Sequence, residues 1–184
     1  MTNAVIHQPD FMPWMGYFSK LIYADKFIVL DNINYSARHY LDRTQIINTQ
    51  GNLMWIKLPI GEPIKKKVNE IYFSDTKVVE KIIQNLHSSY SKARFFKDNI
   101  TYIENILIGS FENSNLLSEI NISIVIKIME ILNLKIPQIK DKVIVELFVK
   151  YFDASWENAI PIKEEYETAK PEVIAEIEQI TSMY

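Results

Sequence analysis

The chain has 184 residues, 48% of them hydrophobic and 23% charged, and a formal net charge of −3. This balance is typical of one folded domain with a sizeable core, and the small excess charge gives no global field that would hold nucleic acid. The absence of cysteine excludes disulfides, thiolate zinc sites and cysteine nucleophiles. Because the sequence shows no secretory signal and no apolar run of roughly 20 residues, we expect a single cytoplasmic domain over residues 1–184, without membrane insertion.

The opening segment is the part of the chain densest in side chains that can do chemistry. Its run from Ala4 to Ile6 predicts a buried strand, Pro9 stops strand pairing, and Pro13 predicts the first turn of a helix. The strand-to-helix loop carries His7, Gln8 and Asp10. Since ligand sites of α/β folds commonly lie at the carboxyl ends of strands, a site in this loop is the leading hypothesis.

A helix and a second strand are predicted after the loop. Aromatic and aliphatic residues at helical spacing come first, at Trp14, Tyr17, Phe18, Leu21 and Ile22. The β-rich run from Lys26 to Asp31 follows. A short helix between two apolar strands favours a parallel crossover, which places the loops after both strands on one edge of the sheet. Asp31 is then expected close to His7, and residues 32–41 are expected to form a loop running on from that edge.

An antiparallel hairpin and then helices are predicted further along the chain. Residues 43–48 and 53–59 flank a turn in which Gly51 supplies a permissive backbone. Residues 68–73 are expected to form one more strand. From Thr76 onward the apolar residues recur at helical spacing, which predicts a mostly helical second half.

The strongest amphipathic stripe of that half comprises Leu117, Ile120, Ile124, Ile128 and Leu132. We expect Pro137 to end this helix. Residues 143–152 suit a strand or a helix, with helix preferred, and residues 171–180 predict a terminal helix. The predicted fold class is α/β, with an N-terminal β-α-β core of parallel strands and a β-hairpin over about residues 1–75, and a mostly helical part over about 76–184.

His7 is the candidate proton carrier of the opening loop. A histidine there can accept and return protons near neutral pH if a carboxylate orients it, and the carboxylates within reach are Asp10, Asp25 and Asp31. A strand-end histidine hydrogen-bonded to backbone is an equally favoured interpretation. Gln8 offers an amide that both donates and accepts, which suits a substrate hydroxyl or carbonyl.

Other candidates each have a structural alternative. Trp14 and Tyr17, three residues apart, can form an aromatic wall for a sugar or base, although core packing is the commoner role at this spacing. Arg43 can clamp a carboxylate or phosphate, or form only a surface salt bridge. The remaining histidines have no ligand-like spacing, so no metal site is predicted, and four glycines in the whole chain form no glycine-rich phosphate loop.

Parts of the sequence resemble the WbqC-like protein family. They are the segment 6–20, with His-Gln-Pro followed by Pro-Trp-x-Gly-Tyr, the run 25–31, and then Tyr35 and Arg43. The resemblance covers about residues 4–135. The family occurs mostly in bacterial gene clusters for O-antigen and related surface polysaccharides. The resemblance therefore implies transfer of an amino acid, glycine in particular, or another acyl group onto a sugar amine. The implied partners are small molecules, an activated amino acid or acyl donor and an amino sugar, and the cofactor stays unknown.

Side-chain chemistry then assigns roles for such a transfer, which requires a base for the amine proton and donors that hold the oxyanion of the tetrahedral intermediate. His7 is the expected base, Asp31 its orienting partner, and Gln8 or Arg43 the donor. The residues expected to bind substrate are Gln8, Asp10, Trp14, Tyr17, Lys20 and Tyr35. Two other hypotheses stay open here, a non-catalytic module that holds a sugar or nucleotide-sugar, and a nucleotide-binding enzyme.

Overall fold

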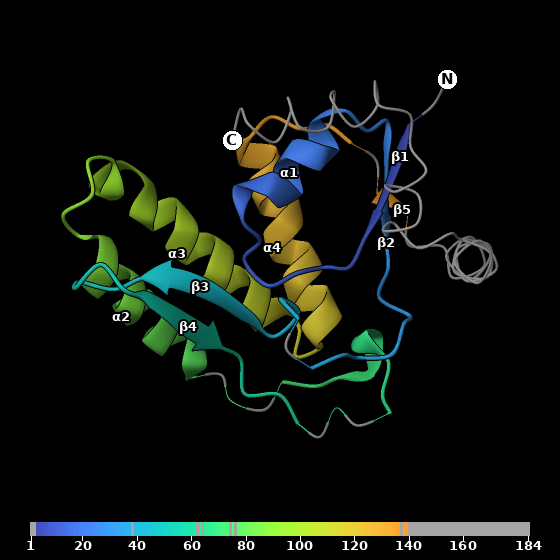
Figure 1. Ribbon diagram of the computed structural model, residues 1–184, viewed down its shortest axis with the longest axis horizontal. Coiled ribbons are helices and arrows are strands. Elements are labelled where there is room, and N and C mark those ends of the chain that lie inside the picture. Colours follow the sequence, from blue (N-terminus) through green and yellow to red (C-terminus); the bar gives the residue numbers. More distant parts are fainter. Residues whose placement is uncertain are drawn as a thin grey trace, which may run out of the picture. The chain divides into compact units, whose positions relative to one another are not determined.

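The computed structural model describes residues 3–37, 39–61, 63, 65–73, 75, 77–136 and 138–139, which all lie in one compact unit of the chain. The elements in chain order are β1 (Ala4–His7), α1 (Met15–Ile22), β2 (Lys26–Val29), β3 (Arg43–Ile47), β4 (Leu53–Lys57), η1 (Val68–Glu70), α2 (Val78–Tyr90), α3 (Phe96–Asn113), α4 (Leu117–Ile131) and β5 (Gln138–Ile139) (Figure 1). The predicted α/β class is confirmed over these residues. The helices expected at 143–152 and 171–180 lie outside them.

Strands β1, β2 and β5 form a parallel sheet in the order β1-β2-β5, and His7 at the end of β1 is the register partner of Val29. This register confirms the parallel crossover through α1. The burial predicted for β1 is wrong, because Ile6 is 38% exposed. Side chains alternate along this edge strand, and only the face with Val5 packs against the core. The sequence did not indicate β5, since a strand of two residues carries no periodicity.

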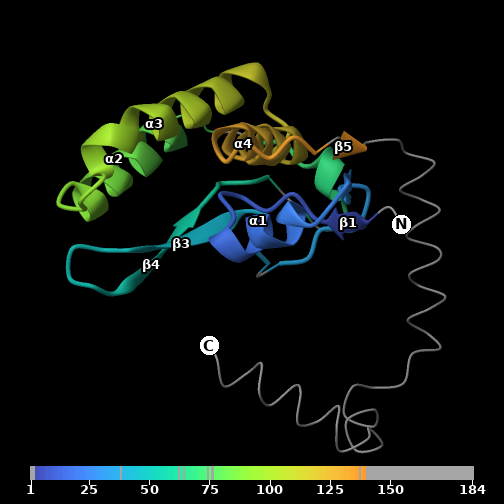
Figure 2. The same cartoon turned by 90° about the horizontal axis from the view of Figure 1, so that it is seen from above.

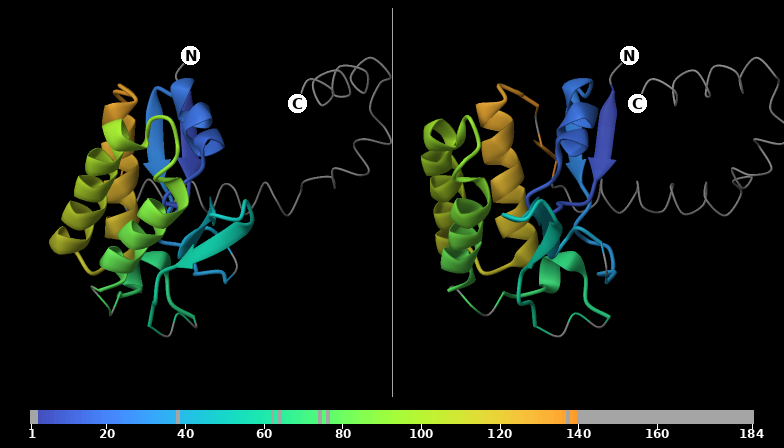
Figure 3. Two further views of the ribbon diagram at one scale, coloured as in Figure 1. Left: turned by 90° about the vertical axis from the view of Figure 1, so that its left-hand side faces the viewer. Right: turned by 60° about the vertical axis from the view of Figure 1, so that its left-hand side comes forward.

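Helix α1 begins at Met15 with Trp14 as its N-cap, so the expectation that Pro13 opens the helix is wrong by two residues. The buried face of α1 comprises Tyr17, Phe18 and Leu21. This face packs with side chains of β2 and α4 in one apolar cluster, whereas Trp14 and Ile22 at the helix ends are exposed. Figure 3 shows α1, β1 and β2 standing together beside helices α2, α3 and α4.

Strands β3 and β4 form the predicted antiparallel hairpin, in which Gln45 is the register partner of Trp55. Gly51 in the turn has φ +82°, a conformation that L side chains rarely adopt. Oδ1 of Asn48 accepts a hydrogen bond from the backbone N of Asn52 at 2.9 Å and so closes the turn locally. The inward row of the hairpin comprises Thr44, Ile46 and Ile56. Figure 2 shows the hairpin lying below α2 and α3.

The segment predicted as a strand at 68–73 is instead the short 3-10 helix η1, followed by isolated β-bridges. The backbone N of Lys67 donates to Oε2 of Glu70 at 3.0 Å, and this local bond favours a turn over an extended chain. Val68 and Ile71 are fully buried. The apolar pattern there therefore reports burial and not strand pairing.

Helix α4 ends at Ile131, well before Pro137, so the expectation that the proline ends it is wrong. Asn133 has φ +55°, and the backbone N of Leu134 donates to the carbonyl oxygen of Met129 at 2.8 Å. This is a Schellman cap, in which asparagine is the residue next best suited after glycine. The helix thus ends through its own local cap.

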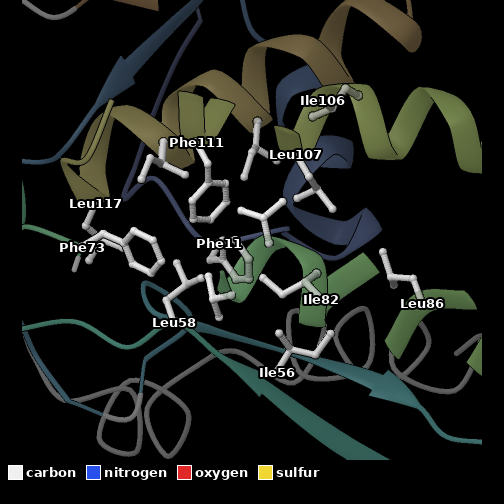
Figure 4. Close-up of a cluster of buried hydrophobic side chains, with 14 of the residues drawn as sticks. Phe11, Ile56, Leu58, Phe73, Ile82, Leu86, Ile106, Leu107, Phe111 and Leu117 are labelled. Carbon is white, nitrogen blue, oxygen red and sulfur yellow. The ribbon is translucent and has the colours of Figure 1, made fainter. Parts of the chain in front are cut away.

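Phe11 of the opening loop lies in the main apolar cluster and has no exposed surface. Figure 4 shows its ring among side chains from the hairpin and from α2, α3 and α4. The ring packs edge-on against Phe111, with the ring centroids 6.5 Å apart. The loop that carries His7 and Asp10 is therefore anchored in the core of the protein.

Candidate functional site

The loop after β1 is tied by hydrogen bonds to the segment before β3 and to β3 itself. The backbone N of Phe11 donates to the carbonyl oxygen of Tyr40 at 2.8 Å, and the hydroxyl of Thr44 donates to the carbonyl oxygen of Met12 at 3.1 Å. Met12 has φ +45°, a left-handed conformation that costs a non-glycine residue about 1 kcal/mol. The surrounding bonds offset this cost, so the loop has one defined path.

Asn121 of α4 joins the same two segments from inside the core. Its Nδ2 donates to the carbonyl oxygens of Pro9 and Leu41, both at 2.8 Å, and its side chain is fully buried. Because both amide protons point at carbonyl oxygens, the orientation of the amide is determined, and Oδ1 has no hydrogen-bond partner among the described residues. Sequence reasoning missed Asn121, although a polar residue within the apolar stripe of α4 is a detectable signal.

His7 ends β1, and Gln8 determines which of its ring nitrogens carries the proton. Nδ1 lies 3.0 Å from the carbonyl oxygen of Gln8, an atom that can only accept a hydrogen bond. Nδ1 therefore holds the proton, and Nε2 presents a lone pair 3.5 Å from Nζ of Lys20. The imidazole packs edge-on against Tyr17, with ring centroids 4.6 Å apart. His7 is thus bonded to backbone and still offers a proton acceptor.

Asp10 is a buried carboxyl group beside His7, with 8% of its surface exposed. Burial raises the pKa of Asp10 above its ordinary value. The charges of His7 and His39, when these imidazoles are protonated, and of Lys20 oppose that rise, with His7 contributing most. A perturbed carboxyl group beside a histidine is a common feature of functional sites. We call His7, Asp10, Tyr17, Lys20 and His39 the His7 cluster.

Tyr17 and Trp14 lie in different environments. Tyr17 is 2% exposed, and its hydroxyl donates to the carbonyl oxygen of Gln8 at 3.0 Å. Burial, reinforced by the charge of Asp10, raises the pKa of Tyr17 far above its ordinary value, so the phenol stays protonated. Trp14 is 68% exposed, and its indole lies over Gly16, where an added Cβ would overlap the ring. Of the two aromatic residues, Trp14 is the one that a ligand can reach.

A second group of predicted and unpredicted residues lies at the start of the hairpin. Nε and Nη2 of Arg43 donate to the two carboxylate oxygens of the buried Asp42, at 3.0 and 3.3 Å. Burial raises the pKa of Tyr35, and the charge of Asp42 raises it further. The guanidinium carbon of Arg43 lies 5.8 Å from the centre of the Trp55 ring, and the Trp55 and Tyr40 ring centroids are 5.7 Å apart. We call these five residues the hairpin cluster.

The predicted site residues therefore belong to two groups. His7, Asp10, Tyr17 and Lys20 share the first, and Arg43 and Tyr35 share the second. Segment 39–43 connects the groups, because the charge of His39 lowers the pKa of Asp10 while the ring of the next residue, Tyr40, contacts Trp55. No sequence signal pointed to His39, since its proximity to Asp10 arises only on folding.

Two predicted roles are not decided by these contacts. Asp31 follows β2, and its carbonyl oxygen accepts a hydrogen bond from the backbone N of Asn69 at 3.0 Å. Its role as the partner that orients His7 stays a prediction, as does the role of the Gln8 amide. The hydrogen-bond partner of Nδ1 of His7 is the backbone carbonyl oxygen of Gln8 and not its side-chain amide.

The fold and these clusters define a mixed α/β protein with a small parallel sheet and a polar group at the carboxyl end of its strand β1. In the part of the chain that the structure describes, no three His, Asp or Glu side chains are grouped so that they could hold a metal ion. Within the same residues, no helix has the length and apolarity needed to cross a membrane.

A profile of the WbqC-like protein family matches residues 8–167, and the chain belongs to this family. The chain is also similar to a curated relative, Uncharacterized protein Rv1507c of Mycobacterium tuberculosis, with 30% identity over 100 residues. That match covers 53% of this chain and 43% of the mycobacterial protein, so the chain spans less than half the length of this relative. No solved structure matches the chain.

Proposed function

We propose that the protein is a transferase of surface-polysaccharide biosynthesis that attaches an amino acid such as glycine, or another acyl group, to a sugar amine. The observation that carries this proposal is the hydrogen bonding of the His7 imidazole. Its Nδ1 proton is directed at the carbonyl oxygen of Gln8, so Nε2 is available to accept a proton. Family membership supports the substrate class.

In the proposed step the amine nitrogen of the sugar forms a bond to the acyl carbon, and the bond from that carbon to the leaving group breaks. Nε2 of His7 accepts the proton that the amine loses. The neighbouring Asp10 stabilises the imidazolium that results, because an opposite charge close by favours the charged form. Nζ of Lys20 lies 3.5 Å from Nε2, so this exposed side chain must move aside when the amine enters.

The oxyanion of the intermediate requires a donor. Arg43 has two of its N–H groups on Asp42. Lys20 is the cation in contact with His7, and we therefore propose its ammonium group as the donor, beside the amide of Gln8.

The test is transfer from a glycyl or acetyl thioester to a hexosamine with a free amino group, measured by mass spectrometry. We expect His7→Ala to lower the rate by about 100-fold or more, which is the usual contribution of a general base. His87→Ala is the matched control, because His87 is a half-exposed histidine on α2 with a side-chain partner, Glu104. If His7→Ala folds and transfers at the wild-type rate, His7 is not the base.

Two rival functions predict different results in the same samples. A non-catalytic sugar or nucleotide-sugar module binds the hexosamine without any turnover. A nucleotide-binding enzyme is stabilised against heat by ATP, since a ligand that binds only the folded state raises the unfolding temperature.

A further inference from the structure

The outward face of the hairpin and the segment just before it carry two exposed aromatic rings, one each, that the proposed chemistry does not use. Trp55 is 43% exposed and Tyr40 is 44% exposed, and the rings are tilted by 41° at 5.7 Å. Neither ring belongs to the apolar clusters of the core. Half-exposed aromatic side chains held next to each other expose an apolar surface with polar edges, which is a common feature of ligand and interface sites.

Polar groups border this aromatic surface. Arg43 lies over Trp55, and its guanidinium group is neutralised by the paired carboxylate of Asp42. Two of the five guanidinium N–H groups bond to Asp42 and Tyr35 is a further hydrogen-bond neighbour, so the remaining N–H groups of the fork are open to a ligand. Gln45, opposite Trp55 in the hairpin, is exposed and can donate and accept. The border therefore offers hydrogen bonds, and the exposed Lys57, the register partner of Arg43, adds one positive charge to it.

This combination fits a neutral ring with one apolar face and many hydroxyl groups. The C–H groups of a pyranose form such an apolar face, and its hydroxyls lie around the rim. A phosphate or carboxylate would meet at Arg43 a guanidinium whose charge the paired Asp42 already offsets, so its attraction is weaker there than at an unpaired arginine. We infer that Trp55 and Tyr40 form a binding subsite for the pyranose ring of a sugar, with Arg43 and Gln45 contacting its hydroxyls.

The position of the subsite relates it to the His7 cluster. The carbonyl oxygen of Tyr40 accepts the backbone N–H of Phe11, which follows Asp10 directly. The aromatic surface and the proposed base are thus supported by two backbone segments that are bonded to each other. This assignment deepens the proposed function, because the subsite would hold the acceptor sugar, but binding itself does not depend on His7.

The experiment is titration of glucosamine and of its nucleotide-linked form, followed by saturation-transfer NMR. We expect binding of both, with Trp55→Ala about five- to tenfold weaker, which corresponds to about 1 to 1.4 kcal/mol, and Trp55→Phe intermediate because it keeps an aromatic ring. Tyr102→Ala is the matched control, because it removes a 63% exposed ring on α3. Binding of the nucleotide-linked sugar alone, with the same loss in Trp55→Ala, still supports the subsite and shows that its ligand is the nucleotide-linked form of the sugar.

The inference is overturned if folded Trp55→Ala binds both sugars as the wild type does, or if Tyr102→Ala loses as much affinity. It is also overturned if sedimentation shows self-association that Trp55→Ala abolishes while sugars do not bind, because the surface is then a protein interface. His7→Ala separates the two proposals: normal sugar binding without transfer supports both, and normal binding with normal transfer removes only the proposed base.

Discussion

The helical half and the opening loop place their polar groups in opposite ways. Between α2 and α3, His87 and Glu104 pair at 2.6 Å with 48% and 26% of their side chains exposed, and the buried polar side chains of α3 and α4 other than Asn121 are the small hydroxyls of Ser110 and Ser118. In the opening loop, Asp10 is buried, and Asn121 reaches from α4 to bond the loop inside the core. Surface pairs contribute little to stability, whereas buried polar groups are costly to leave unpaired. Substitutions of the exposed polar side chains on α2 and α3 should therefore change stability little, whereas substitutions of the buried polar side chains at the loop should cost more.

The largest expected effect is that of Phe11→Ala, which removes the anchor of the loop from the core. We expect a loss of about 4 kcal/mol in the free energy of unfolding, measured by urea denaturation, because a fully buried ring leaves a cavity. Phe95→Ala, at a 60% exposed ring before α3, should change it by less than about 0.5 kcal/mol. Equal losses in both variants would contradict the contrast between the regions.

Asn121→Ala should have the next largest effect. It leaves the carbonyl oxygens of Pro9 and Leu41 without their donor in a buried place, which we expect to cost about 3 kcal/mol. The control is Asn113→Ala, whose side chain bonds the carbonyl oxygen of Gly109 at an exposed position of α3. Denaturation of both variants tests whether an asparagine matters more inside the loop than on a helix surface. If the free energy of unfolding falls less in Asn121→Ala than in the control, Asn121 does not stabilise the connection between the opening loop and the segment before β3.

Asp10→Asn should stabilise the protein at neutral pH and not at acid pH. The folded-state pKa of Asp10 is raised, so the protonated form is the one that folding favours, and that contribution is lost as pH rises through the folded pKa. Asparagine does not ionise, so the variant keeps this contribution to stability at every pH. We expect the unfolding temperature to rise by roughly 2 °C at pH 7, with no gain below pH 3.8, the ordinary value for this group.

Asp98→Asn, at an exposed position in the first turn of α3, provides the comparison for the loss of one negative charge. Calorimetry of both variants across pH should show the gain for Asp10→Asn alone. A gain that is the same at pH 3 and pH 7 would mean that burial of the carboxylate is not its origin.

The smallest effect is expected for His87→Ala, which removes the surface pair with Glu104. Exposed ion pairs are worth about 0 to 1 kcal/mol, so the free energy of unfolding should fall by no more than this amount. Denaturation at pH 6 and pH 8 measures it. A loss above about 2 kcal/mol would show that the helical half also depends on its polar contacts, which would break the comparison.

Much of the fold could be predicted because its signals are local. The parallel crossover follows from two apolar runs with a short helix between them, and the hairpin follows from Asn48 and Gly51 in the turn. The errors were local as well. Glu70 turned an apolar run into a 3-10 helix by bonding Lys67, and Asn133 ended α4 before the proline.

The candidate site was only half predictable. Asp10 lies in the predicted strand-to-helix loop, and His7 lies just before that loop, as the last residue of β1. That these residues form a site stays a prediction, which rests on the rule that parallel strands place such loops at one sheet edge. The spacing of Trp14 and Tyr17 could not separate an exposed ring from a buried one, since helix ends and helix middles are covered differently. Arg43 was expected to act together with His7; in the structure it pairs with Asp42 and lies over Trp55, and its part in the site stays a prediction.

The sequence by itself determined the elements, their order and the loop in which chemistry is most readily placed. Turn residues, caps and apolar periodicity act over a few residues, so they can be read without the fold. Only the tertiary structure decided that Asn121 bonds Pro9, 112 positions earlier in the chain, and that the charge of His39 lowers the pKa of Asp10. Such contacts depend on how helices and strands pack, and no local pattern encodes that packing.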